Sequence, residues 1–464
     1  MSVRQNGAMN PLLHDAALRA SHYLAGLDER RVYPDADALA RLLELDEPLP
    51  EHPQAAEAVL NRLDALGSPA TMANAGGRFF GFVVGGALPV SVAANWLATV
   101  WDQNSANPAG APSTAAFEFT ALRWLRELLD LPRDAAGAFV TGTTMGNLCA
   151  LAAARHAVLE RAGWDVEADG LFGAPPVTVV VGEEAHPTLF KALGVLGLGR
   201  NRVVTVPVDG QGRMRADRLP RLAGPSIVCT QAGNVNTGAF DPFAALCEQA
   251  HRDGAWVHVD GAFGLWAQAA PALRHLCAGV NHADSWATDA HKWLNVPYDS
   301  GLAFVRDESA LRAAMSVTAA YLPASSTRIP SDFTPELSRR ARGVDVWAAL
   351  SALGRDGVAA LVERCCAHAR SFAQGLRDAG FEVLNDVVLN QVLVSFGDAQ
   401  RTRAVVENVQ ADGTCWCGLT QWQGRVAMRI SVSSWATTEA DVQRSLAAIV
   451  GQASDDASTR VGAK

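Results

Sequence analysis

The chain has 464 residues, of which 49% are hydrophobic and 19% charged, and its formal net charge is −9. A chain of this composition can bury a large core, which excludes a mostly disordered protein. A mildly acidic chain without a basic run is a poor ligand for nucleic acid or an anionic membrane, and we expect neither as a partner. Lysine is scarce, because only Lys191, Lys292 and Lys464 accompany the many arginines.

The eight cysteines are scattered along the chain and form no C-x-x-C pair. In a chain of this length they indicate reduced thiols in a cytosol rather than a disulfide scaffold. Cys415 and Cys417 could be half of a metal site, but a short strand or turn with one buried thiol is the simpler interpretation, and no metal is predicted. The first 13 residues lack a basic start followed by an apolar core, so we expect no secretory signal and a cytoplasmic protein.

The first 75 residues are expected to form a helical segment ahead of the main domain, with apolar residues at helical spacing over 36–45 and 53–66. Residues 79–101 then carry no charge and are long enough to span a bilayer. Their glycines and Pro89 argue against a membrane helix. The stripe of bulky residues from Leu88 onward favours a buried loop followed by a helix in the core or at a subunit interface.

From about residue 137, short apolar runs alternate with helical stretches. The expected strands are residues 137–141, 177–181, 202–207, 226–230, 255–260, 285–288 and 301–305. The expected helices are residues 146–162, 187–198, 242–253 and 265–278. Such an alternation predicts an α/β domain with a mainly parallel seven-stranded sheet and helices on both faces. Ligands of these sheets lie at the carboxyl ends of the strands.

Residues 318–342 are polar, contain three prolines and show little periodicity, which predicts a lid or a disordered loop. A helix is expected to restart at 343–354. A smaller α+β domain should follow, with helices at 358–379, 400–411 and 439–449 and strands at 382–385, 391–396 and 426–432. The predicted parts are therefore an N-terminal helical segment (1–75), a large domain (76–345), a small domain (346–455) and a disordered tail (456–464).

Two residues that follow expected strands carry distinctive chemistry. Lys292 lies in apolar surroundings, between Trp286 and Leu294, and desolvation would free its amine to form a Schiff base. A plain half-exposed lysine is the alternative. Asp260 ends the apolar run that starts at Trp256, where it either caps a helix or keeps a heterocyclic nitrogen protonated.

The turn Thr141-Gly-Thr-Thr-Met-Gly-Asn147 joins a strand to a helix and suits a phosphate, although a plain capped turn would look similar. It matches no nucleotide-binding motif. His186 follows another strand, where an imidazole can cap a helix or stack on a flat ring. A phosphate cradle, a stacking ring, an acid partner for a ring nitrogen and a lysine, in this order, are the set that pyridoxal phosphate (PLP) requires.

With these motifs the sequence resembles the group II PLP-dependent amino acid decarboxylases, which act on aromatic amino acids, glutamate, histidine or diaminobutyrate. The resemblance runs from about residue 79 to residue 449 and is most specific at His258-Val-Asp260 and His291-Lys-Trp293. It implies a fold type I (aspartate aminotransferase-like) enzyme. It also implies a homodimer with active sites at the interface and N-terminal helices that clasp the partner.

The resemblance implies a role for each matched residue. Lys292 would form the Schiff base with the cofactor, Asp260 would pair with the ring nitrogen, and His186 would stack on the ring. The remaining cofactor contacts would come from Thr143, Thr144 and His291 at the phosphate and from Ala262 at the other ring face. Arg429 would lie near the substrate carboxylate. Asp289 stands where some relatives have asparagine and would alter the phosphate pocket.

The implied reaction is decarboxylation of an L-amino acid to the amine and CO2. Phe80 and its aromatic neighbours lean towards an aromatic or bulky apolar substrate, unless they belong to the core or a dimer contact. Relatives often use a loop tyrosine to protonate the α-carbon. Tyr321 starts the expected loop and Phe333 lies near its middle, so Tyr321 or His186 would supply the proton if Phe333 takes the tyrosine's position. The alternatives are an aldehyde synthase, which reacts with oxygen instead, or another fold type I lyase or aminotransferase.

Overall fold

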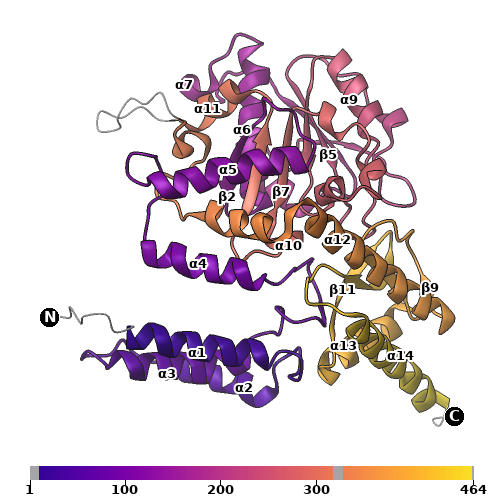
Figure 1. The fold of residues 1–464 in the computed structure, drawn as a ribbon. Coiled ribbons are helices and arrows are strands. Elements are labelled where there is room, and N and C mark those ends of the chain that lie inside the picture. Colours follow the sequence, from indigo (N-terminus) through magenta and orange to yellow (C-terminus); the bar gives the residue numbers. More distant parts are fainter. Residues whose placement is uncertain (1–9, 317–327, 462–464) are drawn as a thin grey trace.

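The structure is a computed structural model that describes residues 10–316 and 328–461. The N-terminal helices α1 (Pro11–Ala25), α2 (Ala36–Arg41) and α3 (Ala56–Ala70) lie together below helix α4 (Pro89–Trp101) (Figure 1). An ion pair of 2.9 Å between Arg19 and Asp64 joins α1 to α3. The helices predicted at 36–45 and 53–66 are confirmed, with a 3-10 turn over Leu42–Leu45 completing the first.

The large sheet contains all seven predicted strands, in the spatial order β2-β8-β7-β6-β5-β3-β4. Strand β8 runs antiparallel to both of its neighbours and the other pairs are parallel. The carboxyl ends of the remaining six strands therefore meet at one edge. The bounds are β2 (Ala136–Val140), β3 (Thr178–Gly182), β4 (Val204–Val206), β5 (Ser226–Gln231), β6 (Trp256–Asp260), β7 (Ser285–Asp289) and β8 (Gly301–Val305).

Helices cover both faces of this sheet, as predicted. One face packs against α6 (Thr143–Glu160), α8 (Pro187–Val195) and α11 (Glu308–Met315), with the short α7 (Val166–Asp169) beside them. The other packs against α5 (Pro112–Leu128), α9 (Phe243–Arg252) and α12 (Arg342–Asp378). Strand β6 alternates between them: Val257 and Val259 join the second core, and Trp256 joins the first. The same alternation turns His258 and Asp260 towards α6.

The helix predicted at 265–278 is wrong. Three short 3-10 turns take its place, over Gly264–Ala269, Arg274–Cys277 and Val280–His282. Pro271 separates the first two turns, because a proline has no N–H to donate and clashes with the preceding helical turn.

The small domain is built on a five-stranded sheet in the order β1-β11-β12-β10-β9. Strand β1 (Phe79–Phe80) pairs with β11 (Trp416–Trp422), so the uncharged stretch 79–101 starts with two residues of this sheet. The predicted buried loop and helix follow, over residues 81–88 and in α4. The other elements are β12 (Arg425–Ser431), β10 (Gln391–Ser395), β9 (Glu382–Val383), α13 (Ala399–Asp412) and α14 (Glu439–Val461). Helix α14 continues into the tail for which disorder was predicted. Within the described residues, no helix is long and apolar enough to cross a membrane.

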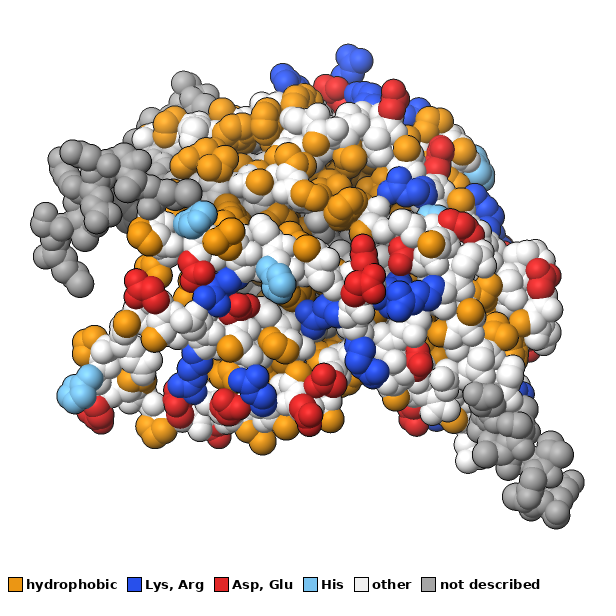
Figure 2. All heavy atoms as spheres, turned by 60° about the horizontal axis from the view of Figure 1, so that its bottom comes forward, with side chains coloured by type: hydrophobic (Ala, Val, Ile, Leu, Met, Phe, Trp, Pro, Cys, Tyr) orange, Lys and Arg blue, Asp and Glu red, His pale blue; other side chains and the backbone are white. Residues whose placement is uncertain are grey.

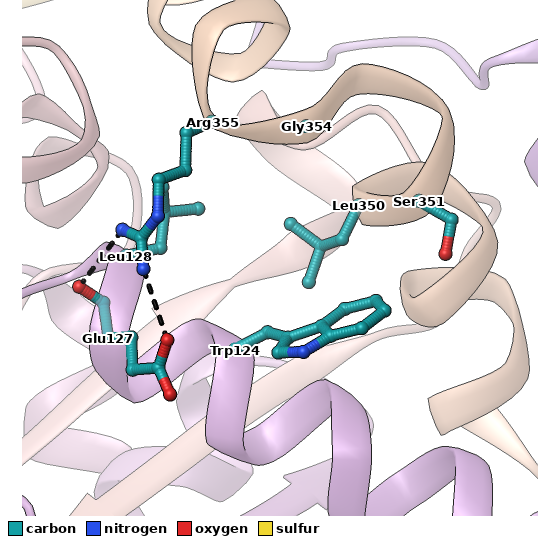
Figure 3. Close-up of a pocket in the computed structure, with 7 residues that line it drawn as sticks. All are labelled: Trp124, Glu127, Leu128, Leu350, Ser351, Gly354 and Arg355. Atoms are coloured by element: carbon teal, nitrogen blue, oxygen red, sulfur yellow. Dashed lines mark hydrogen bonds and ion pairs between the residues drawn. The ribbon is translucent and has the colours of Figure 1, made fainter.

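Helix α12 contains a break at Gly354, whose φ of 60° is not helical. The break separates the two helices predicted at 343–354 and 358–379. A cavity of about 290 Å³ lies beside it, between α5 and α12 (Figure 3). Trp124 and Leu350 form its apolar wall, and Arg355 binds Glu127 at its rim. None of the residues selected from the sequence for their chemistry lines this cavity.

The described end of the predicted loop is part of the core. Phe333 is only 1% exposed and packs with the helices on the α6 face, so the prediction that it belongs to a mobile loop at the site is wrong. The guanidinium of Arg328 lies over its ring at 3.4 Å. Tyr321 lies outside the described residues. Arg339 forms a bidentate ion pair with Glu118 on α5, and both side chains are at most 2% exposed.

This buried ion pair leads to a stability prediction. Replacing Arg339 by alanine leaves the Glu118 carboxylate buried without its partner, which typically costs about 3–5 kcal/mol. We expect a large fall in the urea midpoint of unfolding. The matched control is Arg355→Ala, which removes the exposed pair with Glu127 and should change stability by less than about 1 kcal/mol. Equal midpoints for the two variants would contradict the prediction.

Candidate active site

The candidate active site is a cavity of about 350 Å³ at the carboxyl edge of the large sheet. It collects the ends of β5, β6 and β7, the first residues of α6, the short helix α10 (Ala290–Trp293), and one residue of the small domain. Its polar lining residues are Thr143, Thr144, His186, Thr188, Gln231, Asp260, Asp289, His291, Lys292 and Arg429. All three residues that the sequence placed at the reactive centre, Lys292, Asp260 and His186, therefore line one cavity.

Lys292 meets a carboxylate in this cavity. Its Nζ lies 2.9 Å from Asp289 Oδ2, and the lysine side chain is 20% exposed while the aspartate is 4% exposed. Burial alone would raise the pKa of Asp289, but Lys292 and His291 more than offset this and hold the pKa below its ordinary value. Asp289 is therefore an anion in direct contact with the Lys292 amine.

The start of α6 forms the anion-binding end of the cavity. The backbone N–H of Thr143 donates to Asp289 Oδ1 at 2.6 Å, while the buried Thr143 hydroxyl has no hydrogen-bond partner. An unpaired buried hydroxyl at a helix N-terminus fits a phosphate oxygen. His291 lies beside it, stacked on Tyr298 with 4.2 Å between the ring centres, and its Nδ1 accepts from Ser300 N–H at 3.1 Å.

Asp260 is held by two N–H donors. Ala262 N donates to Oδ1 at 3.2 Å, and Asn147 Nδ2 donates to Oδ2 at 3.0 Å. The carboxylate is 6% exposed, so these bonds carry much of its stabilisation. Asn147 received no role from the sequence, although its place one helical turn after Thr143 is visible there.

His186 is a neutral imidazole with a defined tautomer. Burial lowers its pKa, and the nearby Lys292 and Arg429 act in the same direction against Asp260. Its Nδ1 accepts from the Thr188 N–H at 3.3 Å and also contacts the Thr188 hydroxyl at 2.7 Å. Because Nδ1 accepts, the ring proton is on Nε2. The residue thus caps α8 and lines the cavity, and the two interpretations of its sequence position are compatible.

Of the two residues expected to contact the substrate, Arg429 lines the cavity and Phe80 does not. Arg429 reaches the cavity from β12, donates to the Val235 carbonyl at 3.1 Å, and burial lowers its pKa. Phe80 does not reach it: the side chain is fully buried and packs edge-on against Phe372 in the core. Phe82 lines the cavity instead, because β1 turns Phe80 inward and the chain then adopts a positive φ of 52° at Phe82.

A close backbone approach holds Lys292 in place. A Cβ at Gly85 would lie 1.8 Å from the Lys292 carbonyl oxygen, so only glycine fits. Asn295 secures the same turn, since its side chain donates to the Trp293 carbonyl at 2.8 Å and to the Ser433 carbonyl at 3.1 Å. Of the glycines in the uncharged stretch, Gly85 therefore lies directly against the lysine turn.

Comparison with known proteins places this geometry in a family. Residues 39–397 match the model of the pyridoxal-dependent decarboxylase conserved domain, and the chain belongs to that family. It is a PLP-dependent amino acid decarboxylase of fold type I, as the sequence resemblance implied.

Individual relatives are distant in sequence but align with most of the chain. Tryptophan decarboxylase 1 of Oryza sativa subsp. japonica is 27% identical over 91% of this chain and 89% of its own length. Phenylacetaldehyde synthase of Arabidopsis thaliana is 26% identical over 74% of this chain and 75% of its own. The crystal structure of Oryza sativa TDC with PLP and tryptamine superposes with a TM-score of 0.91 at 23% identity, covering 98% of this chain and 99% of that chain.

The residues present fit PLP. The unpaired Thr143 hydroxyl offers a hydrogen bond to the phosphate, Asp260 offers a fixed anion to the ring nitrogen, and Lys292 offers the amine. When bound, PLP supplies an electron sink for the carbanion that loss of CO2 would leave. The positions of Thr144, His291 and Ala262 in the same lining suit the phosphate and ring contacts expected of them.

Gly85 provides a test of how the lysine is positioned. Gly85→Ala should displace the Lys292 backbone and lower PLP occupancy of the purified protein severalfold, measured as the absorbance at about 420 nm per mole of protein. Gly67→Ala is the control, since nothing lies within 4 Å of a Cβ there and alanine favours the helix. Full occupancy in Gly85→Ala would show that the turn can move without cost.

Proposed function

We propose that the protein decarboxylates an L-amino acid with an aromatic or bulky apolar side chain and releases the amine. The supporting observation is the set of charged residues that line the cavity. Within the described part of the chain, its lysine, aspartate and arginine residues are Lys292, Asp289, Asp260 and Arg429. Each of them has a proposed role at the cofactor or at the substrate carboxylate. Among the residues that the structure describes, no further lysine or arginine lines the wall to receive an acidic side chain, while Phe82, Val83, Val235 and Phe263 supply apolar surface.

The proposed division of labour follows from the contacts. Arg429 is directed by its bond to the Val235 carbonyl and would receive the α-carboxylate of the substrate. Asp260 keeps the cofactor nitrogen charged, and His186 covers the ring. Lys292 would be released from Asp289 when the cofactor binds, and its amine would then be free to hold the cofactor.

His186 lines the cavity, whereas Phe333 is remote in the core, so His186 is the described candidate for protonating the α-carbon after CO2 leaves. It would act as the imidazolium: Nδ1 first gains a proton from solvent, Nε2 then gives its proton to the α-carbon, and the ring returns to its neutral form with Nδ1 protonated. Delivery of that proton gives the amine. The second candidate, an aldehyde synthase, is favoured by the similarity to phenylacetaldehyde synthase and applies if protonation is slow.

One set of assays separates these activities. The PLP-loaded enzyme is incubated with a panel of L-amino acids, and CO2, amine, aldehyde and peroxide are measured. We expect CO2 and amine in equal amounts, with aromatic substrates fastest and acidic ones inactive. Aldehyde and peroxide matching the CO2 would favour the synthase. Lys292→Ala should remove both the activity and the absorbance near ~420 nm.

We also propose that the enzyme works as a cytoplasmic homodimer. Helix α4 exposes five large hydrophobic side chains, which is unusual for a helix on the surface of a monomer. They are Val90, Trp96, Leu97, Val100 and Trp101. Figure 2 brings the bottom of Figure 1 forward and shows hydrophobic side chains gathered over the upper part of that face, with charged side chains mainly below. All eight cysteines are buried thiols, in agreement with a reducing compartment.

Light scattering tests the dimer. Val100 is 63% exposed, and Val100→Asp should convert the dimer to monomer because it buries a charge at the proposed interface. Phe172→Asp is the control: Phe172 is 95% exposed but lies outside α4, and this variant should remain dimeric. A monomer in the unmodified protein would refute the proposal without affecting the assignment of the reaction.

A further inference from the structure

A chain of hydrogen-bonded, buried polar side chains extends from Asp260 on the side that faces away from the cavity. We call it the row. Trp256 Nε1 donates to Ser285 Oγ at 2.8 Å, and Ser285 Oγ lies 2.9 Å from His258 Nδ1. His258 Nε2 lies 2.9 Å from Asn147 Oδ1, and Asn147 Nδ2 donates to Asp260 Oδ2 at 3.0 Å. Ser285, His258 and Asn147 are completely buried, so water does not complete any of these bonds.

The two ends of this row determine the direction of every hydrogen bond in it. An indole N–H can only donate, and an ionised carboxylate can only accept. Ser285 therefore accepts from Trp256 and has its own proton available for His258 Nδ1. The single proton of the neutral imidazole is then on Nε2, from which it is donated to Asn147 Oδ1. Burial lowers the pKa of His258 to about 3, which keeps the ring neutral.

The opposite amide orientation is unfavourable for electrostatic reasons. Turning the Asn147 amide around would place its oxygen 3.0 Å from the Asp260 carboxylate and its NH2 group against the His258 N–H. Both contacts would then be repulsive in an environment where unpaired polar groups are costly. The row thus selects one amide orientation, with the N–H towards Asp260.

We propose that Asn147 is a positioning residue that orients the Asp260 carboxylate towards the cofactor nitrogen, and that His258 and Ser285 hold Asn147 in its donating orientation. A carboxylate whose two oxygens each accept an N–H is fixed in the plane that those donors set. Asn147 and Ala262 each supply one such bond, to different oxygens of Asp260.

Helix α6 makes this contact possible. Gly146 is so close to the sheet that a Cβ would lie 2.8 Å from the Leu302 carbonyl oxygen, and this approach brings Asn147 to β6. Thr143 and Asn147 lie one turn apart on the same side of the helix. The same helix therefore serves both the phosphate end and the ring-nitrogen end of the site.

The central experiment compares two substitutions of different character. Asn147→Ala removes the donor, and the PLP dissociation constant of the holoenzyme should rise by about 10- to 100-fold at both pH 6 and pH 8.5. Asn147→Asp keeps the volume but places a second carboxyl group against Asp260. Two such groups share a proton in acid and repel each other when both ionise.

For Asn147→Asp we therefore expect near-normal cofactor affinity at pH 6 and a loss of at least about tenfold by pH 8.5. The absorbance spectrum of the bound cofactor should change over the same pH interval. The other charged or titratable groups around Asp260 are unchanged in both variants; they are His186, Cys229, Asp289, Lys292 and Arg429. A difference between the variants that depends on pH thus arises at position 147.

Asn390→Ala is the control for loss of a buried asparagine. Its amide bonds Val432 and Ser433 within the small domain, and the variant should keep the pH dependence of the unmodified enzyme. A purely structural role for Asn147 predicts that the isosteric aspartate behaves like asparagine at every pH, and that result would overturn the proposal.

A second measurement remains available if Asn147→Ala does not fold. Nitrogen-15 NMR of histidine-labelled holoenzyme should show His258 with a protonated Nε2 and an unprotonated Nδ1 throughout the neutral range. The resonance is assigned by its absence in His258→Gln. Ser285→Ala should weaken this preference and raise the PLP dissociation constant by a smaller factor than Asn147→Ala. A protonated Nδ1 in the unmodified enzyme would also overturn the proposal.

Discussion

Helix α6 lies so close to strands β7 and β8 that residue 146 has to be glycine, since a Cβ there would meet Leu302 O and Ala287 Cβ at 2.8 and 3.1 Å. This close packing brings the N-terminus of the helix to the carboxyl edge of the sheet, where β6 and β7 end in Asp260 and Asp289. The helix then contributes an N–H to Asp289, an orphan hydroxyl at Thr143 and an amide to Asp260. A site for a phosphate-bearing heterocycle follows from this one helix–sheet contact.

The small domain completes the site through its β11–β12 hairpin. Arg429 lies on β12 and bonds the Val235 carbonyl, while Trp422 at the end of β11 donates to Glu184, two residues before His186. Asn295 adds a third connection by bonding the Ser433 carbonyl directly after the Lys292 turn. The relative position of the two domains therefore controls the arginine, the histidine and the lysine together, because Arg429 makes an interdomain hydrogen bond itself and the other two lie within three residues of one.

Asp289 gives the site an electrostatic feature of its own. The carboxylate accepts from the Thr143 N–H and pairs with Lys292, so one aspartate connects the start of α6 to the lysine amine. Binding of a phosphate at this helix end and reaction of the lysine would both require these contacts to rearrange. The interaction keeps a buried amine and a helix N-terminus satisfied in the protein alone, where either would otherwise be costly to bury.

Local pattern was sufficient for the strands and for the candidate residues that follow them. Runs such as Trp256-Val-His-Val-Asp260 combine β-branched residues with a polar end, which identifies both a buried strand and its functional terminus. Elements governed by distant contacts were missed or misplaced. Strand β1 is two residues long and exists through its pairing with β11, and Phe333 is buried by helices far from it in the sequence.

The amino-acid sequence by itself determined the candidate lysine, its aspartate and histidine companions, the turn that starts α6 and the order of the seven strands along the chain, because each is encoded in a few adjacent residues. The tertiary structure alone decided which strand is antiparallel, that Phe82 and not Phe80 faces the cavity, and which groups support Asp260. Asn147 and Asp260 are 113 positions apart, and no local pattern reports a hydrogen bond that forms only after a helix has packed against a sheet.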